Sequence, residues 1–220
     1  MKIAIQILLW IVIVFLGFKL YQSIRGPIEF NKVKDVRYAK VIKNLKDIRN
    51  AELAYQEITG SFTGDFDSLV QFIDTAQFAI VQRRDTSFAD VAKNKAFGLK
   101  EGYFIEKVLI DTLGFTPVKD SLFKGTERYK TMMKIPIEDV DGNFELKAGK
   151  LEKSNAIYSV FEARVAKAVI LADQNKDLLD QEKQVVSVDG VNGPYIKVGA
   201  MDDVNTSGNW PKLYDSAKDQ

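Results

Sequence analysis

The most conspicuous feature of the hydrophobic pattern is an almost unbroken apolar run near the start of the chain. From Ile3 to Phe18, every residue except Gln6 is apolar or glycine. With the next three residues the run reaches about 19 residues, close to the length that a helix needs to cross a bilayer. A cleaved signal peptide agrees less well with the sequence, because no small-x-small cleavage motif follows the run. We therefore predict that residues 1–25 form a transmembrane anchor.

A second helix, an amphipathic stalk, is predicted from residue 26 to residue 60. Gly26 and Pro27 are expected to end the membrane helix, because proline lacks a backbone N–H and disfavours helix in the residue before it. Beyond them, apolar side chains recur at steps of three and four residues, which places them on one helical face. The members of this apolar stripe are Tyr38, Val41, Leu45, Ile48, Ala51, Tyr55 and Ile58.

Two interpretations of the apolar stripe remain open. It can pack against the protein's own soluble domain, as the apolar face of a surface helix usually does. Alternatively, it can contact a partner helix, as in a coiled coil, in a homo-oligomer or with another membrane protein. The candidate interaction residues under the second interpretation are Tyr38, Val41, Leu45, Ile48 and Tyr55.

Residues 61–220 are predicted to form an α+β soluble head domain with a mainly antiparallel β-sheet. Strand-like segments are separated by glycine and aspartate turns, and the helical segments stand apart from them. The Asp141-Gly142 dipeptide predicts a hairpin between residues 129–135 and 144–151. Further strands are expected at residues 78–82, 104–115, 157–165, 185–188 and 195–198, short helices after Asp65 and at 177–183, and a surface loop at 83–102. Trp210 is expected to hold the C-terminal tail against the head.

Charge and composition narrow the classes of function. The 31 Lys and Arg residues nearly balance the 30 Asp and Glu residues, which does not favour nucleic-acid binding. Residues 1–60 carry ten basic and five acidic side chains, so the basic end lies next to the predicted anchor, where anionic lipids attract it. The chain has no Cys and no His, which excludes thiolate nucleophiles, imidazole bases and disulfides. We expect no enzyme activity, no catalytic residue and no cofactor.

One acidic segment has spacing that resembles a calcium loop. Asp173, Asn175 and Asp177 alternate as the first three ligands of such a loop do. However, Leu178 and Gln184 occupy the positions that calcium loops reserve for Gly and Glu. The favoured interpretation is a turn-forming, solvated acidic segment without a metal, and a calcium-dependent binder is the alternative.

The order of elements resembles that of type IV pilin-like and pseudopilin proteins, in which a membrane helix continues into a long helix and an α+β head. The local match consists of Arg49-Asn50-Ala51-Glu52, Gly60-Ser61-Phe62, Phe66-Asp67-Ser68-Leu69 and Gly193-Pro194-Tyr195-Ile196. Prepilins carry a Gly-Phe cleavage site before the apolar run, whereas Gly17-Phe18 follows the run here. The resemblance therefore implies the architecture and not the processing.

The resemblance also bears on localisation and function. The tail from Gly199-Ala200-Met201 to Gly208-Asn209-Trp210 is similar to single-pass envelope proteins of Bacteroidota, which implies a bacterial inner membrane and a periplasmic head. The positive charges that follow the apolar run favour a cytoplasmic head instead. The expected function is a non-catalytic structural or scaffold subunit of a secretion- or pilus-like envelope assembly, with the bilayer and other envelope membrane proteins as partners. The alternative is an assembly-platform protein that dimerises through its stalk helix.

Overall fold

The computed structural model describes residues 2–100, 102–138 and 140–214. The chain divides into two compact units. Unit 1 combines Met1–Val70 with Arg128–Gln220, and unit 2 is Gln71–Glu127. The class is α+β with two antiparallel sheets, as the sequence predicts, and each unit contains one of the sheets.

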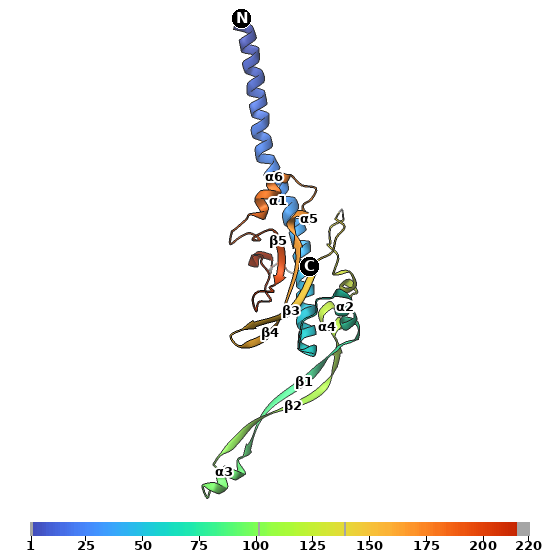
Figure 1. Ribbon diagram of the computed structural model, residues 1–220, viewed down its shortest axis with the longest axis vertical. Coiled ribbons are helices and arrows are strands. Elements are labelled where there is room, and N and C mark those ends of the chain that lie inside the picture. Colours follow the sequence, from blue (N-terminus) through green and yellow to red (C-terminus); the bar gives the residue numbers. More distant parts are fainter. Residues whose placement is uncertain (1, 101, 139, 215–220) are drawn as a thin grey trace. The chain divides into compact units, whose positions relative to one another are not determined.

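The dominant element of unit 1 is the single helix α1, Lys2–Thr59 (Figure 1). The prediction that a helix ends at Gly26-Pro27 is wrong, because Pro27 lies inside α1. Side-chain contacts one turn apart flank the proline: Arg25 Nε lies 2.7 Å from Glu29 Oε1, and Arg25 Nη1 lies 3.2 Å from Tyr21 Oη. Such i, i+4 contacts stabilise a helix modestly and help to offset the one hydrogen bond that proline removes.

The two halves of α1 differ completely in exposure. In the N-terminal half, the large apolar side chains from Ile3 to Ile24 are between 44 and 74% exposed. In the C-terminal half, an apolar face from Tyr38 to Ala54 is buried in the core of unit 1. By length and composition, α1 is the one described helix that could cross a membrane.

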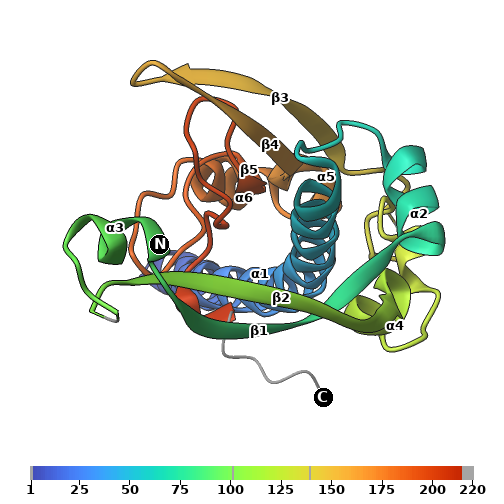
Figure 2. The ribbon, with the colours of Figure 1, turned by 90° about the horizontal axis from the view of Figure 1, so that it is seen from below.

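A three-stranded antiparallel sheet packs against the C-terminal half of α1 (Figure 2). Its strands are β3 (Glu145–Lys153), β4 (Ala156–Ala166) and β5 (Tyr195–Gly199), with β4 in the centre. One face of β4 supplies Phe161, Ala163 and Val165 to the core, and Val160 is buried on the other face. These strands confirm the predicted strand regions at 157–165 and 195–198.

Short helices complete unit 1: α5 (Lys167–Ile170), α6 (Lys176–Lys183), and the 3₁₀ turns η1 (Arg128–Thr131) and η2 (Lys212–Tyr214). The side-chain oxygen of Asn175 caps α6 by accepting hydrogen bonds from the backbone N–H groups of Asp177 and Leu178. Trp210 is buried, which agrees with its predicted role in holding the tail. A further helix, α2 (Phe66–Thr75), contains the boundary between the two units.

The hairpin predicted around Asp141-Gly142 is wrong. Residues 129–135 contain the turn η1, and Lys134 and Asn143 form only an isolated bridge. The hairpin of this region instead joins β3 to β4 through Ser154 and Asn155, whose φ angles are 54° and 62°. Two consecutive residues with positive φ are typical of the tight type I′ turn, which matches the twist of the strands that it joins.

The strand predicted at residues 185–188 is also wrong. No strand is assigned there, and Val186 and Val188 are about 90% exposed. The segment instead forms turns, in which the backbone N–H of Ser187 donates to the side-chain oxygen of Asn192. A strand at this place would need a ladder partner, and the outer edge of β5 is already bonded to residues 207–209.

Unit 2 consists mainly of a long antiparallel ribbon of β1 (Gln77–Ala89) and β2 (Phe104–Pro117). The short helix α3 (Val91–Ala96) follows β1, and α4 (Val118–Phe123) follows β2. The surface loop with a helical turn predicted at residues 83–102 is wrong for residues 83–89, which continue β1 opposite residues 104–110, whereas α3 supplies the helical turn. Pairing with β2 extends β1 through residues 83–89, whose sequence by itself does not predict a strand.

Candidate functional site

A buried cluster of charged side chains joins α1 to the two short helices of unit 1. The carboxylate of Glu182 in α6 accepts hydrogen bonds from three groups: Lys34 Nζ at 3.1 Å, Lys167 Nζ at 2.9 Å and Tyr38 Oη at 3.2 Å. Lys167 has no solvent exposure, and its Nζ also donates to the carbonyl oxygens of Glu182 and Val191, both at 2.7 Å. The cluster therefore links four separate segments of the chain.

Burial controls the protonation of this cluster. It lowers the pKa of Lys167, although the hydrogen bond that Lys167 donates to Glu182 acts in the opposite direction. Burial, together with the nearby charge of Glu182, raises the pKa of Tyr38 far above its ordinary value. With every Lys167 proton donated to an oxygen, the arrangement holds elements together and offers no free base or nucleophile.

The sequence-based reasoning missed Lys167 and Glu182 as a pair. A signal was present: Lys167 is the only charged residue between Val165 and Leu171, in an otherwise apolar stretch. A lysine in such a stretch is buried only when a carboxylate or several carbonyl groups compensate it. Its partner was not evident, because Glu182 belongs to a helix whose other side chains are mostly exposed.

The acidic segment that resembles a calcium loop is dispersed among other partners. Arg37 Nη1 and Nη2 bind Asp173 at 2.5 and 2.8 Å, and this pair lowers the pKa of Asp173 to about 2. Asp180 pairs with Lys183 at 2.9 Å, and Glu182 lies in the buried cluster. Within the described ranges, no three acidic side chains gather in a way that could hold a metal ion.

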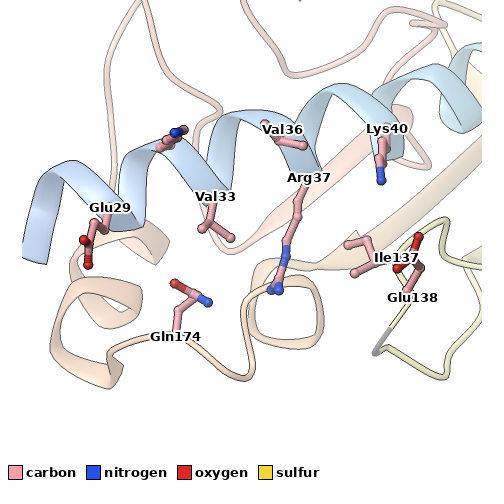
Figure 3. Close-up of a pocket in the computed structure, with 9 residues that line it drawn as sticks. Glu29, Val33, Val36, Arg37, Lys40, Ile137, Glu138 and Gln174 are labelled. Carbon is pink, nitrogen blue, oxygen red and sulfur yellow. The ribbon is translucent and has the colours of Figure 1, made fainter.

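A cavity of about 630 Å³ lies beside α1 near its midpoint (Figure 3). Figure 3 shows Arg37 projecting from α1 into this cavity, between Gln174 and Ile137. The lining mixes basic, acidic and aliphatic side chains: Glu29, Lys32, Val33, Val36, Arg37, Lys40, Ile137, Glu138 and Gln174. The balance of three basic and two acidic residues selects neither an anion nor a cation strongly. We therefore assign no cofactor to this cavity.

The structure places the five predicted interaction residues within unit 1. Tyr38, Val41, Leu45 and Ile48 have at most 1% of their surface exposed, and Tyr55 is half-buried. The apolar stripe thus packs against its own domain, which is the first of the two interpretations that the sequence left open. Contact with a partner helix through these residues stays a prediction.

Glu52 is a second buried charged residue that the sequence did not single out as a site. It belongs to α1 and has no solvent exposure. Its Oε2 accepts a hydrogen bond of 3.0 Å from the backbone N–H of Thr63, whereas its Oε1 has no partner among the described residues. Burial raises the pKa of Glu52 to about 8 despite this hydrogen bond.

Comparisons with protein-family models, with curated proteins and with solved structures found no match for this chain.

Proposed function

We propose that this protein is a single-pass protein of a bacterial inner membrane and a non-catalytic scaffold subunit of a secretion- or pilus-like envelope assembly, with a periplasmic head. The observation that supports this proposal most directly is the contrast along α1. A helix that is apolar on every side belongs inside a protein or a membrane. In its N-terminal half those side chains are exposed, so a bilayer is the environment that suits them.

The continuity of α1 gives the proposed anchor a mechanical role. The same helix that is apolar near its start forms the buried centre of unit 1 further along. A continuous helix holds its ends in a fixed relation, whereas a flexible linker does not. Lys19, Arg25 and Lys32 follow the apolar run on α1, where they can meet anionic headgroups.

The buried polar groups support a structural role over a catalytic one. Lys167, Glu182 and Tyr38 bind one another, and Asp173 binds Arg37. Catalytic groups, in contrast, usually face a cleft with perturbed pKa values and unused hydrogen-bonding capacity. The packing of the apolar stripe within unit 1 also favours a scaffold over an assembly-platform protein that dimerises through the stalk.

Membrane anchoring is tested by washing isolated membranes at alkaline pH, which releases peripheral proteins. We expect the parent protein to stay in the membrane pellet and the double variant Leu9→Lys/Ile13→Lys to be released, because two charges in mid-span are costly. The matched control is Val186→Lys/Val188→Lys, which adds the same charge at exposed positions outside the apolar run. Release of the parent protein would contradict the anchor.

Orientation is tested with the exposed Ser207. Because the chain has no cysteine, the variant Ser207→Cys carries a single thiol. We expect a maleimide that crosses the outer but not the inner membrane to label it in intact cells. Labelling only after lysis of the inner membrane, with the protein folded, would place the head in the cytoplasm, as the positive charges favour.

A further inference from the structure

The ribbon of unit 2 leaves one strand edge with apolar side chains and no partner among the described residues. In the centre of β2, Val108 and Leu109 are about 40% exposed and Ile110 is 64% exposed. Ile105 and Leu113 on the same strand are more than half exposed. A two-stranded ribbon is marginally stable in water, and three or more strands with an apolar face are needed for independent stability. The ribbon therefore has the character of a sheet that is completed by another strand.

The two edges of the ribbon are not equivalent. Opposite the apolar centre of β2, strand β1 carries Arg83, Arg84 and Asp85. Charged residues in the middle of an edge strand discourage pairing with another chain, whereas a long apolar edge invites it. The centre of β2, Val108–Ile110, is thus less protected against pairing than the charged centre of β1 that lies opposite it.

The sequence of β2 is complementary to itself in one antiparallel register. When β2 pairs with β2 of a second copy about Leu109, each Lys107 lies opposite Asp111 of the second copy. In the same register Val108 lies opposite Ile110 of the second copy, and the two Leu109 side chains meet at the twofold axis. Residues 107, 109 and 111 share one face of the strand, and 108 and 110 share the other. One face therefore gains two ion pairs, and the other gains a patch of four β-branched side chains.

Neighbouring registers lose this complementarity. A shift by one residue that brings Val108 opposite Leu109 also places Glu106 opposite Asp111, twice, and like charges in direct opposition destabilise a strand pair. Shifts by two residues leave Lys107 or Asp111 opposite an apolar side chain.

Within its own ribbon, Asp111 binds Arg84 Nη2 at 2.6 Å. Lys107 forms no ion pair among the described residues, so it is available to Asp111 of the second copy.

We propose that two copies of this protein associate through the outer edges of β2, which forms a four-stranded antiparallel sheet in the order β1-β2-β2-β1. The twofold axis passes through Leu109. This assembly goes beyond the proposed scaffold function, which requires no particular contact between copies. The strand bulge between Ile80 and Val81, opposite Leu113, limits the regular part of the edge to the segment that we assign to the interface.

The register is tested by disulfide formation in the full chain, purified in detergent micelles. Residues directly opposite in an antiparallel pair lie close enough for a disulfide. We therefore expect Leu109→Cys to form a covalent dimer under mild oxidation. Ile105→Cys is the matched control, because the two copies of residue 105 would lie roughly 27 Å apart. A mixture of Glu106→Cys and Thr112→Cys chains should cross-link, since these positions face each other within the regular part of the edge.

The ion pairs are tested in the Leu109→Cys background by charge reversal. Lys107→Glu and Asp111→Lys should each reduce the initial cross-linking rate about tenfold, because each replaces two attractive contacts by two repulsive ones. A mixture of the two variants should recover the parental rate, since every pair is again of opposite charge. This recovery distinguishes pairing from damage to the ribbon by either substitution.

Three outcomes would overturn the proposal: equal cross-linking at positions 105 and 109, insensitivity to both charge reversals, or cross-linking of Leu109→Cys in cells only to a different protein. The test is separate from that of the anchor. A washed membrane pellet that retains a monomeric protein contradicts the β2 interface alone, and a covalent dimer that is released by the wash contradicts the anchor alone.

Discussion

At the scale of single residues, the most informative positions are charged side chains in places where a charge is costly. Lys167 and Glu182 compensate each other, and three hydrogen bonds satisfy the ammonium group. Glu52 has no such cation, and its burial makes the neutral acid the favoured form at and below neutral pH. The two sites therefore predict opposite consequences when their charge is removed.

Replacing Glu182 by Gln should destabilise unit 1 by about 3–5 kcal/mol, because it leaves Lys167 buried without its counter-charge. Denaturant unfolding of the full chain in micelles, followed by near-UV circular dichroism, measures this loss. Asp180→Asn is the matched control on the same helix. Its pair with Lys183 is exposed to solvent and contributes little to stability. Equal effects of the two substitutions would show that the buried cluster does not stabilise the fold.

Replacing Glu52 by Gln should change the pH dependence of stability. Because the folded-state pKa is about 8 and thus above the ordinary value of 4.5, Glu52 favours folding below pH 4.5 and loses this contribution as the pH rises to 8. The parent should lose roughly 4 kcal/mol more than Glu52→Gln over that interval. Glu57→Gln, at an exposed position on α1, should unfold with the parental pH profile. Parallel profiles for the parent and Glu52→Gln would contradict the raised pKa.

At the scale of elements, contacts between segments far apart in the sequence determined the secondary structure where the local sequence was ambiguous. Asp141-Gly142 has strong turn chemistry, yet the segments on its two sides form only the isolated bridge between Lys134 and Asn143. Ser154-Asn155 forms the hairpin instead, because β4 buries apolar side chains against α1 and β3 pairs with β4 along its whole length. Asparagine tolerates a positive φ better than most residues, so it is the local feature that permits the turn.

The turn between β3 and β4 gives a prediction at this scale. Asn155→Val should destabilise the hairpin by about 1–2 kcal/mol, because a β-branched residue is strained at a φ of 62°. Asn155→Gly should have an effect of less than about 1 kcal/mol, since glycine adopts that conformation freely. The control, Glu152→Val, introduces the same side chain at an exposed position of β3, where valine suits the extended backbone. Urea midpoints of the three variants provide the comparison.

At the scale of the whole molecule, the two units differ in how their stability is obtained. Unit 1 has a core built around α1, whereas the ribbon of unit 2 is exposed over most of its length. Among the described residues from 82 to 111, only Asn94 is buried, and it binds Tyr103 within the same segment. The ribbon is therefore suited to contact something outside its own chain.

Shortening the ribbon should leave unit 1 intact. Val81 and Thr112 are directly paired, so residues 82–111 can be replaced by an Asn-Gly turn. We expect the thermal midpoint of unit 1, followed through Trp210, to shift by less than about 3 °C. A large loss of stability would show that unit 1 depends on the ribbon. The same shortened protein should lose the association through β2, which links this prediction to the proposed interface.

The sequence by itself determined the features that depend on local composition and periodicity. The apolar run, the stripe from Tyr38 to Tyr55 and the strands at 104–115, 157–165 and 195–198 all follow from repeats of one to four residues. The α+β class follows from their order. The absence of Cys and His determined which chemistry the chain lacks.

The tertiary structure alone decided the features that depend on distant partners. The β2 ladder, for example, makes a strand of residues 83–89. Lys167 meets Glu182 only after α5 and α6 fold against α1. Strand pairing and buried ion pairs gain their free energy from groups far apart in sequence, so no local pattern specifies them.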